Sequence, residues 1–96
     1  MTVEAHWNGE TIARSETTVM VEGNHYFPPA SVNRGNLVHS SKTTHCPWKG
    51  DASYFSINAG GEMNTDAAWC YTDPKPKAEH IRDHIAFYGS VEIIES

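Results

Sequence analysis

The stretch DASYFSINAGGEMNTDAAWCYTD, residues 51–73, decides the fold that we expect for this chain. Apolar and polar residues alternate along it, which is the pattern of β-strands with one buried face. Gly60 and Gly61 stand between the two alternating halves and supply the backbone freedom that a tight reversal needs. We therefore predict a β-hairpin that turns near Gly60–Gly61.

The same alternation continues toward the N-terminus. Residues 5–15 predict a first hairpin, because Asn8-Gly9 favours the positive φ angles of a primed two-residue turn. Residues 17–23 predict one strand. We expect residues 24–36 to form a loop, since consecutive prolines cannot donate to a sheet ladder.

A helical pattern occurs only near the C-terminus. Ala78, Ile81 and Ile85 recur at helical spacing, Pro76 suits a first turn and Gly89 suits a stop. A short strand over residues 90–96 follows. The sequence thus predicts a mainly β protein: one small antiparallel β domain over residues 1–96 with a single short C-terminal helix.

Size and charge exclude several function classes. A chain of 96 residues forms one domain, and a net charge of -5 with scattered Lys and Arg argues against nucleic acid as a partner. No apolar run approaches the roughly 20 residues that span a bilayer, so no membrane association is expected. The N-terminus lacks the pattern of a signal peptide. We expect a cytoplasmic protein in which Cys46 and Cys70 stay reduced.

The segment TTHCPWKG, residues 43–50, holds the first candidate chemical group, Cys46. A thiol becomes nucleophilic when a nearby cation lowers its pKa. Lys49 can approach across the Pro47 turn, whereas His45 is adjacent on a strand and points to the other face. The alternative is that Cys46 is a packed, inert side chain, as free cysteines usually are.

The loop EGNHYFPP, residues 22–29, is the second candidate. Glu22, His25 and Tyr26 place a carboxylate, an imidazole and a phenol within five positions of a stiffened loop. In the alternative interpretation, Tyr26 and Phe27 anchor the loop in the core while Glu22 and His25 are solvated. In AAWCYT, alternation puts Trp69 and Tyr71 on one face and Cys70, as a packing residue, on the other.

A metal site is not expected. The chain has no C-x-x-C pair, which a structural zinc site would need. His80 and His84 would share one face of the predicted helix, but no third ligand accompanies them. We therefore expect no metal and no cofactor.

Four ordered segments resemble those of a known family. VEGNHYFPP, THCPWKGDASYFS, DAAWCYTDPKP and IAFYGSVEI, which together extend over most of the chain, are similar to the motifs of the DUF427 family. Members of this family are small and mostly bacterial, so the resemblance implies a small bacterial protein with a β-tent (Mss4-like) fold. The zinc knuckles of several β-tent proteins are missing here, so zinc does not carry over.

The family also bears a nucleotidyltransferase label, but no two aspartates sit two residues apart to hold the metal ions of such enzymes. The motif residues, as placed here, are Glu22, His25, Tyr26, Cys46, Pro47, Trp48, Lys49, Gly50, Tyr54, Trp69, Tyr71 and Tyr88.

These observations lead to two hypotheses of different class. In the first, the two motifs EGNHYFPP and CPWKG form a small-molecule pocket. Cys46 is its nucleophile or a polar contact, Glu22 or His25 is the acid or base, and Lys49 binds an anionic group. Whether such a pocket is catalytic is left open. The pocket's ligand-contacting rings are Tyr26, Trp48, Tyr54, Trp69, Tyr71 and Tyr88; Trp48 is also expected to pack under its turn.

In the second hypothesis the chain is a non-catalytic binding or assembly module, and it pairs with a copy of itself to form a homodimer. The aromatic rings then form the interface and Cys46 is packing.

Overall fold

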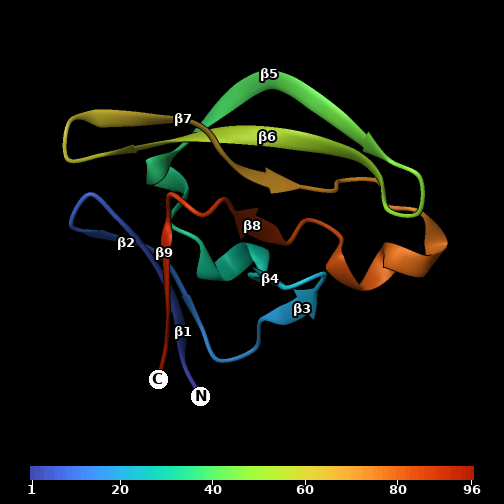
Figure 1. Ribbon diagram of the computed structural model, residues 1–96, viewed down its shortest axis with the longest axis horizontal. Helices are drawn as coiled ribbons and strands as arrows, with labels where there is room; N and C mark the ends of the chain where they lie inside the picture. The colour runs from blue at the N-terminus through green and yellow to red at the C-terminus, as the bar shows by residue number, and fades with distance from the viewer.

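The computed structural model describes residues 1–96 and contains nine β-strands and three short 3-10 helices (Figure 1). The elements in chain order are β1 (Val3–Trp7), β2 (Glu10–Ser15), β3 (Val19–Val21), β4 (Asn24–Tyr26), η1 (Pro29–Ser31), η2 (Arg34–Asn36), β5 (Leu37–Cys46), β6 (Gly50–Ala59), β7 (Glu62–Cys70), η3 (Pro76–Ile81), β8 (Ile85–Phe87) and β9 (Glu92–Glu95). The prediction of a mainly β chain is confirmed.

The strands form three antiparallel sheets. Their orders are β2-β1-β9, β3-β4 and β5-β6-β7-β8. In Figure 1 the four-stranded sheet arches over the three-stranded one, and η3 lies at the end where β5 turns into β6. The two termini lie side by side, because Thr2 and Ser96 exchange two backbone hydrogen bonds of 2.8 and 2.9 Å.

Both predicted hairpins are present. In the first, Asn8 and Gly9 take φ angles of 50° and 80° between β1 and β2. In the second, Gly60 and Gly61 take φ angles of 60° and 78° between β6 and β7. Positive φ at both central residues is the signature of a primed turn, whose twist matches that of the strands it joins.

The four-stranded sheet has a separate hydrophobic cluster on each face. Successive residues of its strands alternate between the two, as the pleat requires. Phe55, Cys70 and Ile85 belong to the first cluster, which lies against β1 and β2. Tyr54 and Ala86 belong to the second cluster, which is covered by the β3–β4 hairpin and η3. The second cluster is the part of the core that supports the candidate site.

The predicted loop over residues 24–36 is wrong at its start. Asn24–Tyr26 forms β4 and pairs with β3, because Glu22 and Gly23 make a tight turn with φ angles of 53° and 82°. Sequence reasoning missed this turn since Asn, Asp and Gly are the residues that usually take a positive φ, and Glu is not.

The predicted C-terminal helix is also wrong beyond its first turns. Only Pro76–Ile81 is helical, as a 3-10 segment, and Asp83 then takes a φ of 59°. Ile85 starts β8 and exchanges backbone hydrogen bonds of 2.8 and 2.9 Å with Phe27. Ile81 and Ile85, which the helical spacing predicted to lie on one helix face, instead belong to different clusters: Ile81 to the second and Ile85 to the first. None of the helical segments has the length and apolar character needed to cross a bilayer.

We predict that Gly50→Ala destabilises the fold. Gly50 pairs with Cys46 where β5 turns into β6, and its φ is 109°, a conformation that side chains rarely adopt. A Cβ there would also lie 3.4 Å from the carbonyl oxygen of Asp73. We expect the free energy of unfolding, measured by urea denaturation, to fall by about 1–3 kcal/mol.

The matched control is Gly89→Ala, because a Cβ at Gly89 meets no atom within 4 Å. Equal stability of the two variants would contradict the strain at Gly50.

Candidate functional site

The turn after β3 and the turn after β5 meet through one carboxylate. Glu22 accepts a hydrogen bond from the ammonium of Lys49, with which it forms an ion pair, and a second one, of 3.3 Å, from the indole N–H of Trp48. Two motifs more than twenty residues apart in sequence are therefore in direct contact. Of the four side chains predicted to converge as catalytic groups, the structure brings Glu22 and Lys49 together.

Lys49 is the unusual member of this pair because it is only 7% exposed. Its ammonium lies 5.5 Å from the ring centroid of Trp48 and 5.4 Å from that of Tyr71. Burying a charge is costly unless the charge is paired, and here one carboxylate and two aromatic faces compensate it.

The pKa values of the pair are displaced in opposite directions. The hydrogen bond from Lys49, followed by that from Trp48, lowers the pKa of Glu22. Burial by itself lowers the pKa of Lys49, but the bond to Glu22 and the phenols of Tyr26 and Tyr71 outweigh it, so that the pKa is raised. Both groups are consequently charged at neutral pH.

Trp48 does not pack under its turn, contrary to expectation. It is 37% exposed, because the underside of the turn at Gly50 is occupied by the backbone of Asp73–Lys75. The backbone amide of Lys75 donates to the carbonyl of Lys49 at 2.9 Å. The side-chain ammonium of Lys75 donates to the carbonyl of Pro47 at 2.8 Å. The indole is left at the surface.

A shallow hollow of about 400 Å³ opens beside this indole. We call it the Trp48 hollow; its lining residues are Pro47, Trp48, Lys75, Pro76 and Lys77. Sequence reasoning missed the contribution of residues 75–77. The available signal was the alternation of proline and lysine in PKPK, which places two amines on a stiff segment directly after the DAAWCYT motif.

The other predicted ring residues do not line this hollow. Tyr26, Tyr54 and Tyr71 are buried in the second cluster, to which Tyr26 belongs as a residue of the β3–β4 hairpin. Trp69 is half-buried and donates to the hydroxyl of Tyr26 at 3.1 Å. The rings thus fill a core layer, and the predicted aromatic walls of one open pocket are not found.

Tyr88 lies at the surface of that layer and is 42% exposed. Its ring stacks on Tyr54 with centroids 6.2 Å apart, and the two hydroxyls lie 3.2 Å apart. The hydrogen bond with Tyr54, together with burial, raises the pKa of Tyr88 to about 12. Tyr88 is therefore neutral at physiological pH and does not line the Trp48 hollow.

His25 does not join Glu22 and Lys49. Its two ring nitrogens contact the hydroxyl of Thr18 at 2.7 Å and the carboxylate of Glu95 in β9. Neighbouring residues of a strand point to opposite faces, so that the burial of Tyr26 in the second cluster sends His25 the other way. The predicted acid–base role of His25 beside Cys46 has no geometric support.

The two cysteines occupy opposite sides of the sheet. Cys46 is half-buried and packs against the second cluster. Cys70 is buried in the first cluster, as alternation predicted, and burial raises the pKa of its thiol. Both are free thiols.

His80 and His84 do not share a helix face, because η3 ends at Ile81. Nowhere does the structure gather three or more His, Cys, Asp or Glu side chains in a way that could hold a metal ion.

Comparison with known families agrees with the motif resemblance. The family model described as "Domain of unknown function (DUF427)" matches residues 1–96, which is the whole chain. A search of curated proteins found no match.

We predict that the Glu22–Lys49 pair makes stability depend on pH in the acidic range. Since the pKa of Glu22 is below its ordinary value of 4.5 in the folded chain, the unfolded chain binds more protons at this carboxyl. The pair therefore stabilises the fold above pH 4.5 and loses this effect as the pH falls through the folded value. Urea denaturation at a series of pH values should show a smaller acid loss for Glu22→Gln than for the wild type.

The control for this series is Glu16→Gln, which changes an exposed carboxylate between β2 and β3. It should keep the acid loss of the wild type. A difference between Glu22→Gln and wild type that stays constant with pH would contradict a charge effect.

We predict that the two thiols differ in accessibility. In the folded protein, iodoacetamide should alkylate the half-buried Cys46 more slowly than it alkylates the free thiol of glutathione. It should leave the buried Cys70 unmodified, as measured by peptide mass spectrometry. In denaturant both should react. Alkylation of folded Cys46 faster than glutathione would instead reveal an activated nucleophile.

Proposed function

We propose that this chain, which belongs to the DUF427 family, is a binding protein for a small organic anion that carries a planar ring. The proposal locates the ligand in the Trp48 hollow. The observation that carries the proposal is the exposed indole of Trp48, whose N–H donates a hydrogen bond to Glu22. The side chains of Lys75 and Lys77 line the same hollow. An aromatic platform with a few placed polar groups is the usual composition of a ligand site.

The charges around the hollow favour an anion. Lys49 is neutralised by Glu22, whereas Lys75 contacts only a backbone carbonyl and Lys77 forms no ion pair. Two uncompensated ammonium groups therefore flank the indole in a chain whose net charge is -5. A local positive field in an acidic protein attracts anions and orients them. Glu22 and Lys49 then act as supports for the platform, and the ligand's ring would stack on Trp48.

Binding is supported better than catalysis. Nucleophilic catalysis needs a base within hydrogen-bond reach of the nucleophile. His25 is bonded to Thr18 and Glu95, and His45 to Asp51 at 2.7 Å, so that neither imidazole is presented to Cys46. The catalytic roles that the sequence suggested for Cys46 and His25 are not part of this proposal.

The proposal keeps three expectations that come from the family resemblance and the sequence: the fold group, the origin and the location. Two antiparallel sheets that pack on each other support an assignment to the β-tent (Mss4-like) group. The bacterial origin and the cytoplasmic location stay predictions.

Assembly with a second copy is the alternative function. The observation in its favour is that Trp48 and Tyr88 are large rings at the surface. Light scattering over a dilution series discriminates: a dimer that dissociates in Trp48→Ala or Tyr88→Ala supports assembly, and a monomer at every concentration removes it.

The test of anion binding is an NMR titration with phenyl phosphate, which has one ring and one anionic group. Amide shifts should be confined to Trp48, Lys49, Lys75 and Lys77, since Pro47 and Pro76 have no amide proton, and the indole N–H of Trp48 should move with them. In the double variant Lys75→Glu/Lys77→Glu we expect the affinity to fall at least about tenfold, because each attraction becomes a repulsion.

The single variants Lys75→Glu and Lys77→Glu are compared with the control Lys42→Glu, which makes the same single charge reversal at a lysine over the Tyr54 ring. The control should retain most of the affinity. The proposal fails if phenyl phosphate moves no resonance of the hollow, or if neutral benzyl alcohol binds equally well.

A further inference from the structure

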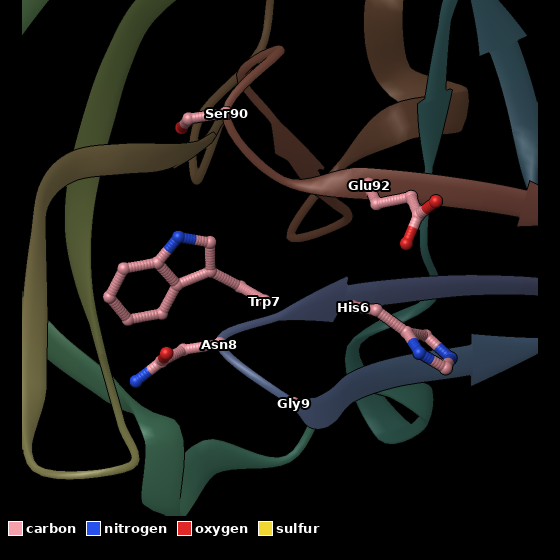
Figure 2. A pocket seen from close by; sticks show the side chains of 6 residues that line it. All are labelled: His6, Trp7, Asn8, Gly9, Ser90 and Glu92. Atoms are coloured by element: carbon pink, nitrogen blue, oxygen red, sulfur yellow. The ribbon is translucent and has the colours of Figure 1, made fainter.

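A second hollow, of about 250 Å³, lies where the β1–β2 turn meets the connection from β8 to β9 (Figure 2). We call it the Trp7 hollow, and its lining residues are His6, Trp7, Asn8, Gly9, Ser90 and Glu92. None of them belongs to the Trp48 hollow. The two hollows lie on different elements, and in Figure 1 the β1–β2 turn and the β5–β6 turn stand at opposite ends of the molecule.

The indole of Trp7 provides the platform of this hollow. Trp7 is the last residue of β1, is half-buried and packs against the first hydrophobic cluster. Figure 2 shows its ring spread in the opening between Asn8 and Ser90, with Glu92 on the neighbouring strand. Because the core holds one side of the ring, the indole is an ordered surface for a ligand to stack on.

The polar groups around Trp7 include two acceptors that receive no hydrogen bond within the chain, the amide oxygen of Asn8 and the carboxylate of Glu92. The side-chain amide nitrogen of Asn8 donates to the carbonyl oxygen of Ala59 at 2.9 Å. The side-chain amide oxygen of Asn8 is available to accept a hydrogen bond. His6 lies opposite Glu92 in the β1–β9 ladder, but its imidazole is paired with Glu4 at 2.6 Å. Glu92 forms no ion pair, although a histidine is its direct neighbour.

An indole and an unpaired carboxylate that line the same hollow together select for positive charge. A cation is attracted to the face of a tryptophan, the best of the aromatic rings for this purpose. The carboxylate of Glu92 adds a direct charge attraction, and an anion would be repelled by it. Local charge thus distinguishes the Trp7 hollow from the Trp48 hollow, where two amines flank the ring.

We propose that the Trp7 hollow is a second binding site, and that it takes a small organic cation of the alkylammonium class. The alkyl groups of the ligand would lie on the indole, and its charge would face Glu92. The inference does not depend on anion binding at Trp48, because no residue and no ligand charge is shared between the two hollows.

Choline and 3,3-dimethylbutan-1-ol test the proposal, because they have the same shape and differ in charge. The readout is an NMR titration of the wild-type protein. Choline should shift the indole N–H of Trp7 and the amides of Asn8, Gly9 and Ser90, while the neutral alcohol should shift them at least about twofold more weakly at equal concentration. Equal shifts by the two molecules, or no shift by choline, would overturn the proposal.

Substitutions locate the binding energy. Glu92→Gln keeps the size of an exposed side chain and should weaken choline binding about two- to fivefold. The control Asp73→Asn removes one negative charge from an exposed carboxylate that faces Arg82 and does not line the Trp7 hollow, and it should leave choline binding unchanged. An unchanged affinity in Glu92→Gln would overturn the assigned role of the carboxylate.

The ring is tested by Trp7→Phe, which keeps an aromatic face with a weaker attraction for cations, and by Trp7→Leu, which removes it. Choline affinity should fall in that order. Since Trp7 also packs on the core, each variant is first shown to fold by its NMR spectrum, and the choline–alcohol comparison stands without either of them.

Discussion

The ion pair between Lys49 and Glu22 is the interaction on which the rest of the candidate site depends. A lysine that is 7% exposed must keep a partner for its charge, since an unpaired buried ammonium is unfavourable. Glu22 can be that partner because it sits in a turn of positive φ that directs it across the gap between two hairpins. The pair thereby fixes the turn after β3, the turn after β5 and the indole of Trp48 relative to one another.

The four-stranded sheet makes this arrangement possible because both of its faces are covered. Its alternating side chains form one cluster against the three-stranded sheet and another against the β3–β4 hairpin and η3. A chain of 96 residues has little core to spare. Three of the four motif tyrosines, Tyr26, Tyr54 and Tyr71, therefore serve as core of the second cluster. At the two ends of the molecule, where turns meet, Trp7 and Trp48 each line a hollow together with charged side chains.

Local rules predicted the hairpins and failed where the chain makes distant contacts. Asn8-Gly9 and Gly60-Gly61 are turn signals that act within four residues, and both turns formed. The Glu22–Gly23 turn was missed since its residues lack that signal, and its stability comes from a partner outside the turn. Ile85 fitted a helical repeat but pairs with Phe27, a contact over more than fifty residues that no local pattern records.

From the sequence alone follow the β class, the two primed turns, the opposite faces of Trp69 and Cys70, and the family, because alternation, turn chemistry and ordered motifs are properties of short segments. Tertiary structure alone decided which motif side chains touch. It paired Glu22 with Lys49, turned His25 toward Glu95, buried Tyr54 and Tyr71, and left Trp48 at the surface. The physical reason is that the direction of a strand residue follows from its own segment, whereas its burial and partner depend on what the rest of the chain packs against that face.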